Sequence, residues 1–274
     1  MKGQIIKIIS NDYFVSYQEK EYICKARGKL KNKNITPKVG DYCIFNKNEK
    51  IIEKILPRKN QLDRPSVSNI DEAFIITSLK KPNFSDNLLD KLLIICEING
   101  INPIICLTKK DLLTKREWKK LKKVINYYKK LGYKVVYNNQ ISKIKKMFKN
   151  KTTVFTGQTG AGKSTLMNRL DKNLNFETNE ISEALGRGKH TTRYVTLVPL
   201  NKGKVLDTPG FSALDLSEYN DEDIRDAFVE FKKNKCKYKN CMHINEKECK
   251  VKKEVGKTIL SSRYENYKKL LEKR

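Results

Sequence analysis

Apolar and polar residues alternate over short runs in the first sixty positions. The runs cover residues 4–9, 13–17, 21–26, 39–45 and 50–55. Short alternating runs separated by turn residues are typical of a small antiparallel barrel or sandwich. Five strands fit an OB-type β-barrel, from which the basic segment 25–38 would project as a loop. We therefore predict a β-barrel domain over residues 1–62.

From about residue 71 the pattern changes to buried strands alternating with amphipathic helices. We expect strands at 73–77, 103–107, 133–137 and 152–156. Ser85 is expected to cap a first helix with apolar residues from 88 to 98, which Gly100 ends, and a second helix is expected near 117–131. The alternation predicts an α/β domain with a parallel sheet covered by helices, over residues 63–219.

The last part of the chain, residues 220–274, is expected to form an α-helical domain around a cysteine-rich loop. Helical spacing predicts one helix with Ile224, Phe228 and Phe231, and a second with Leu260, Tyr264, Tyr267 and Leu271. Two such helices bury little apolar surface, so they need a staple or a neighbouring element.

A glycine-rich loop follows the strand expected at 152–156 and precedes a helix. It has the eight-residue phosphate-binding pattern, made by Gly157, Gln158, Thr159, Gly160, Ala161, Gly162, Lys163 and Ser164, with Thr165 after it. The strand before it and the helix after it are the context that confirms this motif. Backbone N–H groups would surround the phosphates, Lys163 would meet the β/γ oxygens, and the Ser164 hydroxyl would ligate Mg²⁺.

A second motif, Asp-x-x-Gly, lies about fifty residues downstream of the phosphate loop. Asp207 ends an expected strand and would hold Mg²⁺ through its water shell. The Gly210 N–H can meet the γ-phosphate and so sense its loss. This pattern is a common turn when it stands alone, and its distance from the phosphate loop makes it informative.

A third motif indicates which base is bound. Its residues, again at the end of an expected strand, are Thr108, Lys109, Lys110 and Asp111. A carboxylate at the last position accepts hydrogen bonds from N1 and N2 of guanine, a donor pair that adenine does not offer, while a lysine stem lies along the ring. The three motifs together predict a site for GTP and GDP.

The order of the motifs is unusual, since the base motif precedes the phosphate loop by about fifty residues. Ordinary GTPases have the reverse order. A circular permutation explains this, because the termini of a compact domain often lie close together. The segment after Gly210 then leads directly into the C-terminal domain.

Four metal-ligating residues lie in the C-terminal loop: Cys236, Cys241, His243 and Cys249, with four, one and five residues between them. Three thiolates and an imidazole predict a closed tetrahedral site for one structural Zn²⁺. The remaining cysteines fall in expected strands or an apolar helix and are expected in the core; they are Cys24, Cys43, Cys96 and Cys106.

The permuted order, the preceding barrel, the segment 186–192 and the Cys/His loop together resemble the ribosome-small-subunit-dependent GTPase family (RsgA/YjeQ). The resemblance covers essentially the whole chain. It implies a barrel, a permuted GTPase domain and a zinc-binding helical domain. It also implies a role in late maturation of the small ribosomal subunit, with contacts to its rRNA.

Two positions depart from common GTPase patterns. Thr108 stands where Asn is usual. The Asn amide would tie the base motif to the phosphate loop, so with Thr we expect weaker nucleotide affinity and unchanged base choice. Phe211 follows Gly210 where many GTPases have the Gln that orients the attacking water. His190 is our candidate for that task, although it could equally be an exposed loop histidine. Thr192, favoured over its neighbour Thr191, is expected to complete the Mg²⁺ shell and, with His190 and Lys163, to form the catalytic group.

The chain of 274 residues has 58 Lys and Arg against 31 Asp and Glu, a formal charge of +27. Residues 109–151 alone have 16 basic and 2 acidic residues. This balance indicates a polyanionic partner, although part of it could be ordinary solvated surface. The lysines around the cysteine loop have the same two interpretations, since they could contact phosphates or form a solvated basic surface. They are Lys232, Lys233, Lys235, Lys237 and Lys239.

Two alternative functions fit parts of the pattern. One is a nucleotide-gated RNA chaperone in which hydrolysis is incidental. The other is a regulator at a membrane surface, which the barrel and the zinc site argue against. The sequence has no apolar run of membrane-spanning length and no secretory signal, so we expect a cytoplasmic protein with no membrane partner. Nothing in the sequence suggests more than a monomer.

Overall fold

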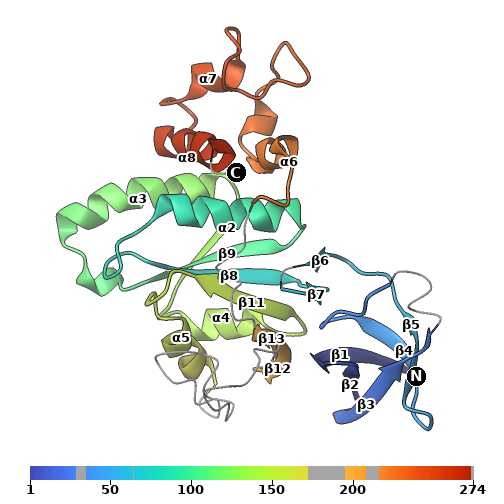
Figure 1. Ribbon diagram of the computed structural model, residues 1–274. Coiled ribbons are helices and arrows are strands. Elements are labelled where there is room, and N and C mark those ends of the chain that lie inside the picture. The colour runs from blue at the N-terminus through green and yellow to red at the C-terminus, as the bar shows by residue number, and fades with distance from the viewer. Residues whose placement is uncertain (29–34, 64, 172–194, 208–215, 273–274) are drawn as a thin grey trace. The chain divides into compact units, whose positions relative to one another are not determined.

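The computed structural model describes residues 1–28, 35–63, 65–171, 195–207 and 216–272. The chain forms two compact units. Unit 1 comprises Met1–Ala73, Asn139–Phe155 and Lys163–Phe211, and unit 2 comprises Phe74–Asn138, Thr156–Gly162 and Ser212–Arg274. Figure 1 shows the elements of both units.

Unit 1 begins with a closed five-stranded barrel, as predicted. Its strands are β1 (Lys2–Ile9), β2 (Asp12–Tyr17), β3 (Lys20–Ala26), β4 (Tyr42–Asn46) and β5 (Ile51–Ile55). They are ordered β1-β2-β3-β5-β4, and the antiparallel pairing of β1 with β4 closes the barrel. Inward residues of the alternating runs, such as Val15 and Phe45, are fully buried in the barrel core. Cys24 and Cys43 belong to this core, as expected.

A buried carboxylate fastens the barrel to the short hairpin β6 (Gln61–Leu62) and β7 (Val67–Ser68). Asp41 is fully buried and receives hydrogen bonds from Arg58 Nε at 2.7 Å and from the Ser68 hydroxyl at 2.7 Å. A paired and hydrogen-bonded charge is the form in which a carboxylate is tolerated inside a protein.

Unit 1 continues with α4 (Ile141–Met147), β11 (Thr152–Gly157), α5 (Lys163–Leu170), β12 (Thr196–Leu200) and β13 (Gly203–Asp207). β11 and β13 pair in parallel, while β12 and β13 form an antiparallel hairpin. The barrel continues into this hairpin, since β1 pairs with β12 at Lys7 and Thr196, and Lys204 Nζ donates to Gln4 Oε1 at 2.5 Å.

Unit 2 contains the strands and helices predicted between residues 73 and 137. The elements are β8 (Glu72–Ser78), α2 (Asp86–Ile98), β9 (Asn102–Thr108), the 3₁₀ helix η1 (Lys110–Leu112), α3 (Lys115–Lys130) and β10 (Lys134–Tyr137). β9 lies between β8 and β10 and pairs with β10 in parallel. Helices α2 and α3 lie on one side of these strands (Figure 1). The Ser85 hydroxyl caps α2 by accepting from Leu88 N, as predicted. Cys96 and Cys106 are fully buried, as expected.

The C-terminal part of unit 2 contains α6 (Asp221–Ala227), the 3₁₀ helix η3 (Phe231–Lys233), α7 (Lys250–Glu254) and α8 (Ser261–Glu272). The prediction of one helix through Ile224, Phe228 and Phe231 is wrong in extent. Phe228 has extended backbone angles and ends α6. All three side chains are nevertheless buried, because Phe228 and Phe231 stack at 5.0 Å and both contact Tyr267 of α8. Leu260 lies just before α8.

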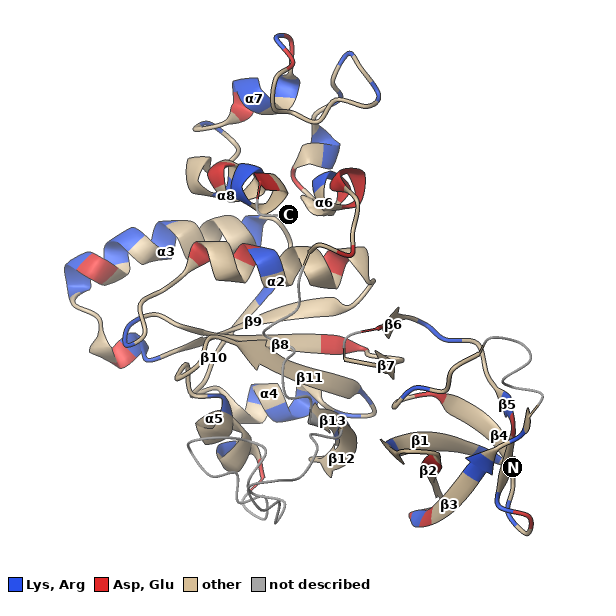
Figure 2. Ribbon diagram, viewed as in Figure 1, with Lys and Arg blue, Asp and Glu red and all other residues tan. Residues whose placement is uncertain are grey.

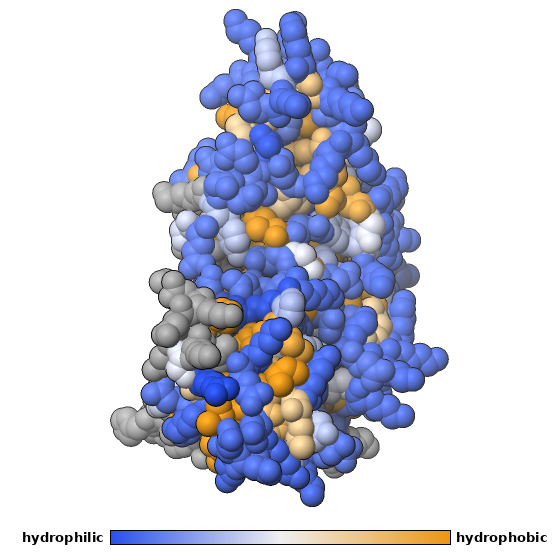
Figure 3. Space-filling model, turned by 90° about the vertical axis from the view of Figure 1, so that its right-hand side faces the viewer, coloured by the Kyte–Doolittle hydropathy of each residue, from blue (hydrophilic) through white to orange (hydrophobic). Residues whose placement is uncertain are grey.

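Charged and hydrophobic residues are distributed unevenly over these elements. Lys and Arg follow one another along α3, where Glu117 is the single acidic residue (Figure 2). Hydrophilic residues dominate the face in Figure 3, and hydrophobic residues there form small groups. No helix within the described ranges is both long and apolar enough to cross a membrane.

Candidate functional site

The phosphate loop turns away from β11 at a position that only glycine can occupy. Gly157 has φ +130°, and a Cβ there would lie 2.1 Å from the carbonyl oxygen of Ile76 in β8. A side chain would therefore both strain the backbone and clash with it. The loop runs on to Ala161, which is fully buried, and to Gly162, which also has positive φ.

The structure brings the base motif and the phosphate loop together within unit 2. The Thr108 hydroxyl donates to the carbonyl oxygen of Ala161 at 2.7 Å, and Thr108 is only 2% exposed. Lys109 Nζ donates to the carbonyl oxygen of Gly160 at 2.8 Å and to that of Lys81. Thr108 thus makes the tie that the sequence analysis assigned to an Asn amide. The two loops, about fifty residues apart in the chain, form one site.

The next two residues of the base motif lie in η1 and differ in their surroundings. Lys110 Nζ lies 4.4 Å from the ring centroid of Trp118 and 5.2 Å from that of Tyr137. Cation–π contacts of this kind hold the ammonium group over the aromatic rings. Asp111 is exposed, so its carboxylate is accessible to a ligand.

The phosphate loop continues into the first turn of α5. Lys163 begins the helix, and its burial lowers the pKa of its ammonium group. A nearby phosphate would offset that effect by favouring the charged form. Ser164 is partly buried and Thr165 is exposed. A helix start after a glycine loop directs backbone N–H groups to one point, which is the usual arrangement for binding phosphate.

Strand β13 ends at Asp207, the first residue of the Asp-x-x-Gly motif. β13 and β11 are parallel, with Thr152 opposite Lys204 and Val154 opposite Leu206. The carboxyl end of β13 is therefore at the sheet edge where β11 leads into the phosphate loop. Gly210, Phe211, His190 and Thr192 lie outside the described residues.

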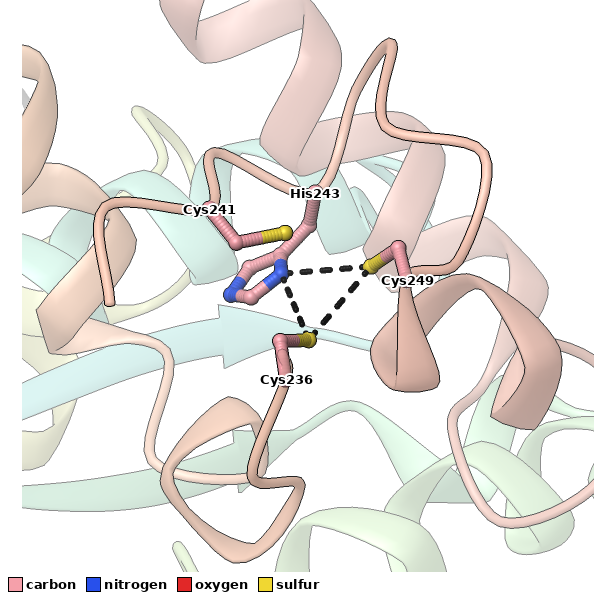
Figure 4. Close-up of side chains that lie close together, drawn as sticks. All are labelled: Cys236, Cys241, His243 and Cys249. Carbon is pink, nitrogen blue, oxygen red and sulfur yellow. Dashed lines mark hydrogen bonds between the residues drawn. The ribbon is translucent and has the colours of Figure 1, made fainter. Parts of the chain in front are cut away.

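Cys236, Cys241, His243 and Cys249 converge in the C-terminal part of unit 2 (Figure 4), with their ligand atoms all within 4.8 Å of one another. His243 Nδ1 lies 3.3 Å from Cys249 Sγ and 3.6 Å from Cys236 Sγ, and the two sulfurs are 3.8 Å apart. A tetrahedral ion with Zn–S bonds of ~2.3 Å separates two sulfurs by ~3.8 Å. Burial lowers the pKa of His243, which favours the neutral, metal-binding imidazole. The cluster is thus compatible with one zinc ion.

Hydrogen bonds to the backbone fix the loop that carries these ligands. The Tyr264 hydroxyl donates to the carbonyl oxygen of His243 at 2.6 Å, and the Tyr267 hydroxyl donates to that of Met242 at 2.5 Å. Glu246 accepts from Met242 N and Ile244 N at 2.7 and 3.0 Å. Helix α8 thus holds the ligand loop in place through its tyrosines.

A buried charge network joins the C-terminal helices to α2. The Arg263 guanidinium is fully buried and donates to Asp90 of α2 and to Glu230. Asp90 also receives hydrogen bonds from the Tyr128 hydroxyl at 2.6 Å and from Asn266 Nδ2 at 2.7 Å. Although burial opposes its charge, the two carboxylates raise the pKa of Arg263 well above its ordinary value. The neighbour that the C-terminal helices were expected to need is therefore α2. This network could not be predicted from the sequence, because an arginine and an aspartate far apart in the chain share no local pattern.

A phosphate loop joined to a base motif that precedes it in the chain defines a P-loop GTPase of circularly permuted order. The family model described as RsgA GTPase matches residues 55–217, and the model described as RsgA N-terminal domain matches residues 2–51. This chain belongs to the RsgA family of GTPases, as its motifs led us to expect.

Curated relatives match over nearly the full length. The "Small ribosomal subunit biogenesis GTPase RsgA" of Enterococcus faecalis is 44% identical, with 99% of this chain and 94% of the relative covered. That of Pediococcus pentosaceus is 42% identical, with 98% and 92% covered. Among solved structures, YloQ, described as a circularly permuted GTPase, has a TM-score of 0.81 at 33% identity, with 99% and 94% covered. YjeQ from Thermotoga maritima has a TM-score of 0.83 at 31% identity, with 100% and 99% covered.

Proposed function

We propose that this protein binds the small ribosomal subunit and hydrolyses GTP to assist a late step of subunit maturation, with turnover stimulated by the subunit. The names of its relatives support the ribosomal role. The observation that carries the nucleotide-binding part is the pair of hydrogen bonds from Thr108 to Ala161 and from Lys109 to Gly160. These bonds join the base loop to the phosphate loop, which supports a single nucleotide pocket formed by both.

In this proposal each motif has a defined task. Asp111 accepts hydrogen bonds from N1 and N2 of guanine, and the stem of Lys109 lies along the base. The phosphates are held by backbone N–H groups and by Lys163 at the start of α5. The complete nucleotide-binding set is Thr108, Lys109, Lys110, Asp111, Gly157, Gln158, Thr159, Gly160, Ala161, Gly162, Lys163, Ser164, Thr165, Asp207 and Gly210.

Mg²⁺ supplies charge neutralisation at the β- and γ-phosphates when it is bound. Ser164 and Thr192 would be its direct ligands, and Asp207 would hold it through water. His190 would orient the attacking water with its neutral imidazole, since Phe211 has no hydrogen-bonding group for this task. A site with neither a Gln nor an Arg finger predicts slow turnover of the free protein.

The polyanionic partner in this proposal is the rRNA of the small subunit. The barrel, residues 1–62, and the C-terminal domain, residues 220–274, would dock on it, while the GTPase domain, residues 63–219, binds the nucleotide. Consecutive basic residues along α3 (Figure 2) offer a further phosphate-contacting surface. One structural zinc would hold Cys236, Cys241, His243 and Cys249. We propose that the protein acts as a monomer in the cytoplasm and has no membrane partner.

Base choice and partner can be tested in two assays. In the first, GTP and ATP compete for the wild-type protein and for Asp111→Asn. We expect GTP to bind the wild type far more tightly than ATP, and Asp111→Asn to lose most of that preference while both proteins remain folded. In the second, small subunits are sedimented with the protein and either GDP or a non-hydrolysable GTP analogue. More protein should sediment with the analogue than with GDP. Equal binding of ATP and GTP would refute the base site, and failure to sediment with either nucleotide would refute the partner.

A further inference from the structure

A cleft of about 350 Å³ lies beside the Cys/His cluster in unit 2. Its walls include Arg225 of α6, Lys232 of η3, and the loop residues Lys235, Tyr238 and Lys239. Phe231, His243 and two of the clustered cysteines also face it. The cleft volume lies at the lower end of the range of small-molecule sites, roughly 300–1,000 Å³.

The charges around this cleft are mostly positive. Arg225 Nε is paired with Asp226 Oδ1 at 2.8 Å, and both residues line the cleft. Within the described ranges, none of the three lysines has a carboxylate within salt-bridge distance, whereas the neighbouring Lys237 pairs with Glu248 at 3.4 Å. Lys235 and Lys239 therefore offer two ammonium groups to an anionic ligand. Lys232 offers a third, although it also acts on Glu97 of α2, a carboxyl group whose pKa burial raises and Lys232 lowers.

An exposed aromatic ring stands among these lysines. Tyr238 is 54% exposed, the most exposed large aromatic side chain in the described part of the protein. Lys237 Nζ lies over this ring, 5.8 Å from its centroid. A flat ring beside cations can serve as a platform for stacking an unpaired base. Every base has a π face, so this mode of binding tolerates different sequences.

We propose that this cleft binds one unpaired nucleotide of a single-stranded RNA segment. The base stacks on Tyr238, and the flanking phosphates lie against Lys232, Lys235 and Lys239. Arg225, which is paired with Asp226, also lines the cleft. This inference rests on the proposed RNA-binding function and gives it a specific contact. The Cys/His cluster would then have a direct use, because it fixes the loop on which Tyr238 and Lys239 lie.

The test uses the full-length, zinc-loaded protein and a fluorescently labelled pentauridine RNA, with binding followed by anisotropy. Tyr238→Ala should weaken binding by roughly 5- to 100-fold, the range for loss of one base–aromatic stack. Tyr238→Phe retains the ring and should bind within about twofold of the wild type. A pentauridine with abasic central positions should bind the wild-type protein as weakly as intact RNA binds Tyr238→Ala.

Charge variants provide the matched control. Lys239→Ala removes a positive charge from the cleft wall, while Lys257→Ala removes one from an exposed position of the same module that does not line the cleft. Only Lys239→Ala should weaken RNA binding appreciably. Zinc content and the unfolding midpoint are measured for each variant, and Tyr238→Ala should change neither because the ring is exposed.

Three outcomes would overturn the inference. The first is that Tyr238→Ala binds the RNA as tightly as the wild type does. The second is that the wild type binds intact and abasic RNA equally well. The third is that free uridine monophosphate displaces the RNA fully at a concentration equal to that of the RNA. None of these depends on the GTPase activity. If the cleft assignment fails while small subunits still stimulate GTP hydrolysis by the wild type, the proposed function stands; if stimulation is absent, the function fails independently of the cleft.

Discussion

Removal of the Thr108 hydroxyl should weaken nucleotide binding without changing base choice. Thr108→Val keeps the shape of the side chain but deletes the donor that lies 2.7 Å from the carbonyl oxygen of Ala161. Both residues are buried, so the carbonyl would lose a hydrogen bond where water has little access. Leaving a buried acceptor unsatisfied costs about 1–3 kcal/mol. If the phosphate-binding arrangement of the loop is destabilised by about 1–2 kcal/mol of this cost, the affinity for GDP falls roughly 5- to 30-fold.

The assay is a titration with a fluorescent GDP analogue, in parallel with ATP competition and urea unfolding. Thr108→Asn should bind within about threefold of the wild type, because its amide can donate to the same carbonyl. Thr153→Val is the matched control, since it deletes a buried hydroxyl that donates to Glu72 at 3.2 Å, away from the phosphate loop. It should lower stability and leave GDP affinity unchanged. Wild-type affinity of Thr108→Val would refute the idea that this bond shapes the site.

Three further predictions concern the rest of the molecule. Arg263→Met leaves Asp90 and Glu230 as buried charges without an ionic partner, so the free energy of unfolding in urea should fall by about 3–5 kcal/mol. The control Lys268→Met breaks the solvent-accessible pair with Glu265 and should lower it by less than about 1 kcal/mol. Equal losses would contradict the role of the network. Cys241→Ser should release the metal and unfold the C-terminal module with nucleotide binding intact; metal analysis that still finds one tightly bound zinc would oppose the assignment. His190→Ala should bind GTP normally but lose subunit-stimulated turnover, and unchanged turnover would exclude His190 as the group that orients water.

Much of this fold could be predicted because many of its strands and helices have their own pattern of apolar, polar and capping residues. The alternation of apolar and polar residues predicted the barrel strands. Ser85, which caps α2, precedes an apolar run long enough for a helix. The base motif and the phosphate loop were expected to share a nucleotide because each follows a buried strand. The structure adds the hydrogen bond from the Thr108 hydroxyl to the carbonyl oxygen of Ala161, a contact that a sequence pattern does not show.

Features that depend on distant residues were not predictable in the same way. Helical spacing continues through Phe231, yet α6 ends at Ala227, and the phenyl rings of Phe228 and Phe231 pack on Tyr267 from outside that helix. Arginine is usually a surface residue. The burial of Arg263 depends on the charge of Asp90, which lies 173 residues away in the chain. Tertiary packing overrode local propensity in both cases.

The most direct test of the central claim is the rate of GTP hydrolysis by the wild-type protein with and without purified small ribosomal subunits. The account predicts slow hydrolysis by the free protein and a rate at least tenfold higher with small subunits, with no such increase for large subunits or for ATP. A rate with small subunits equal to that of the free protein would contradict it.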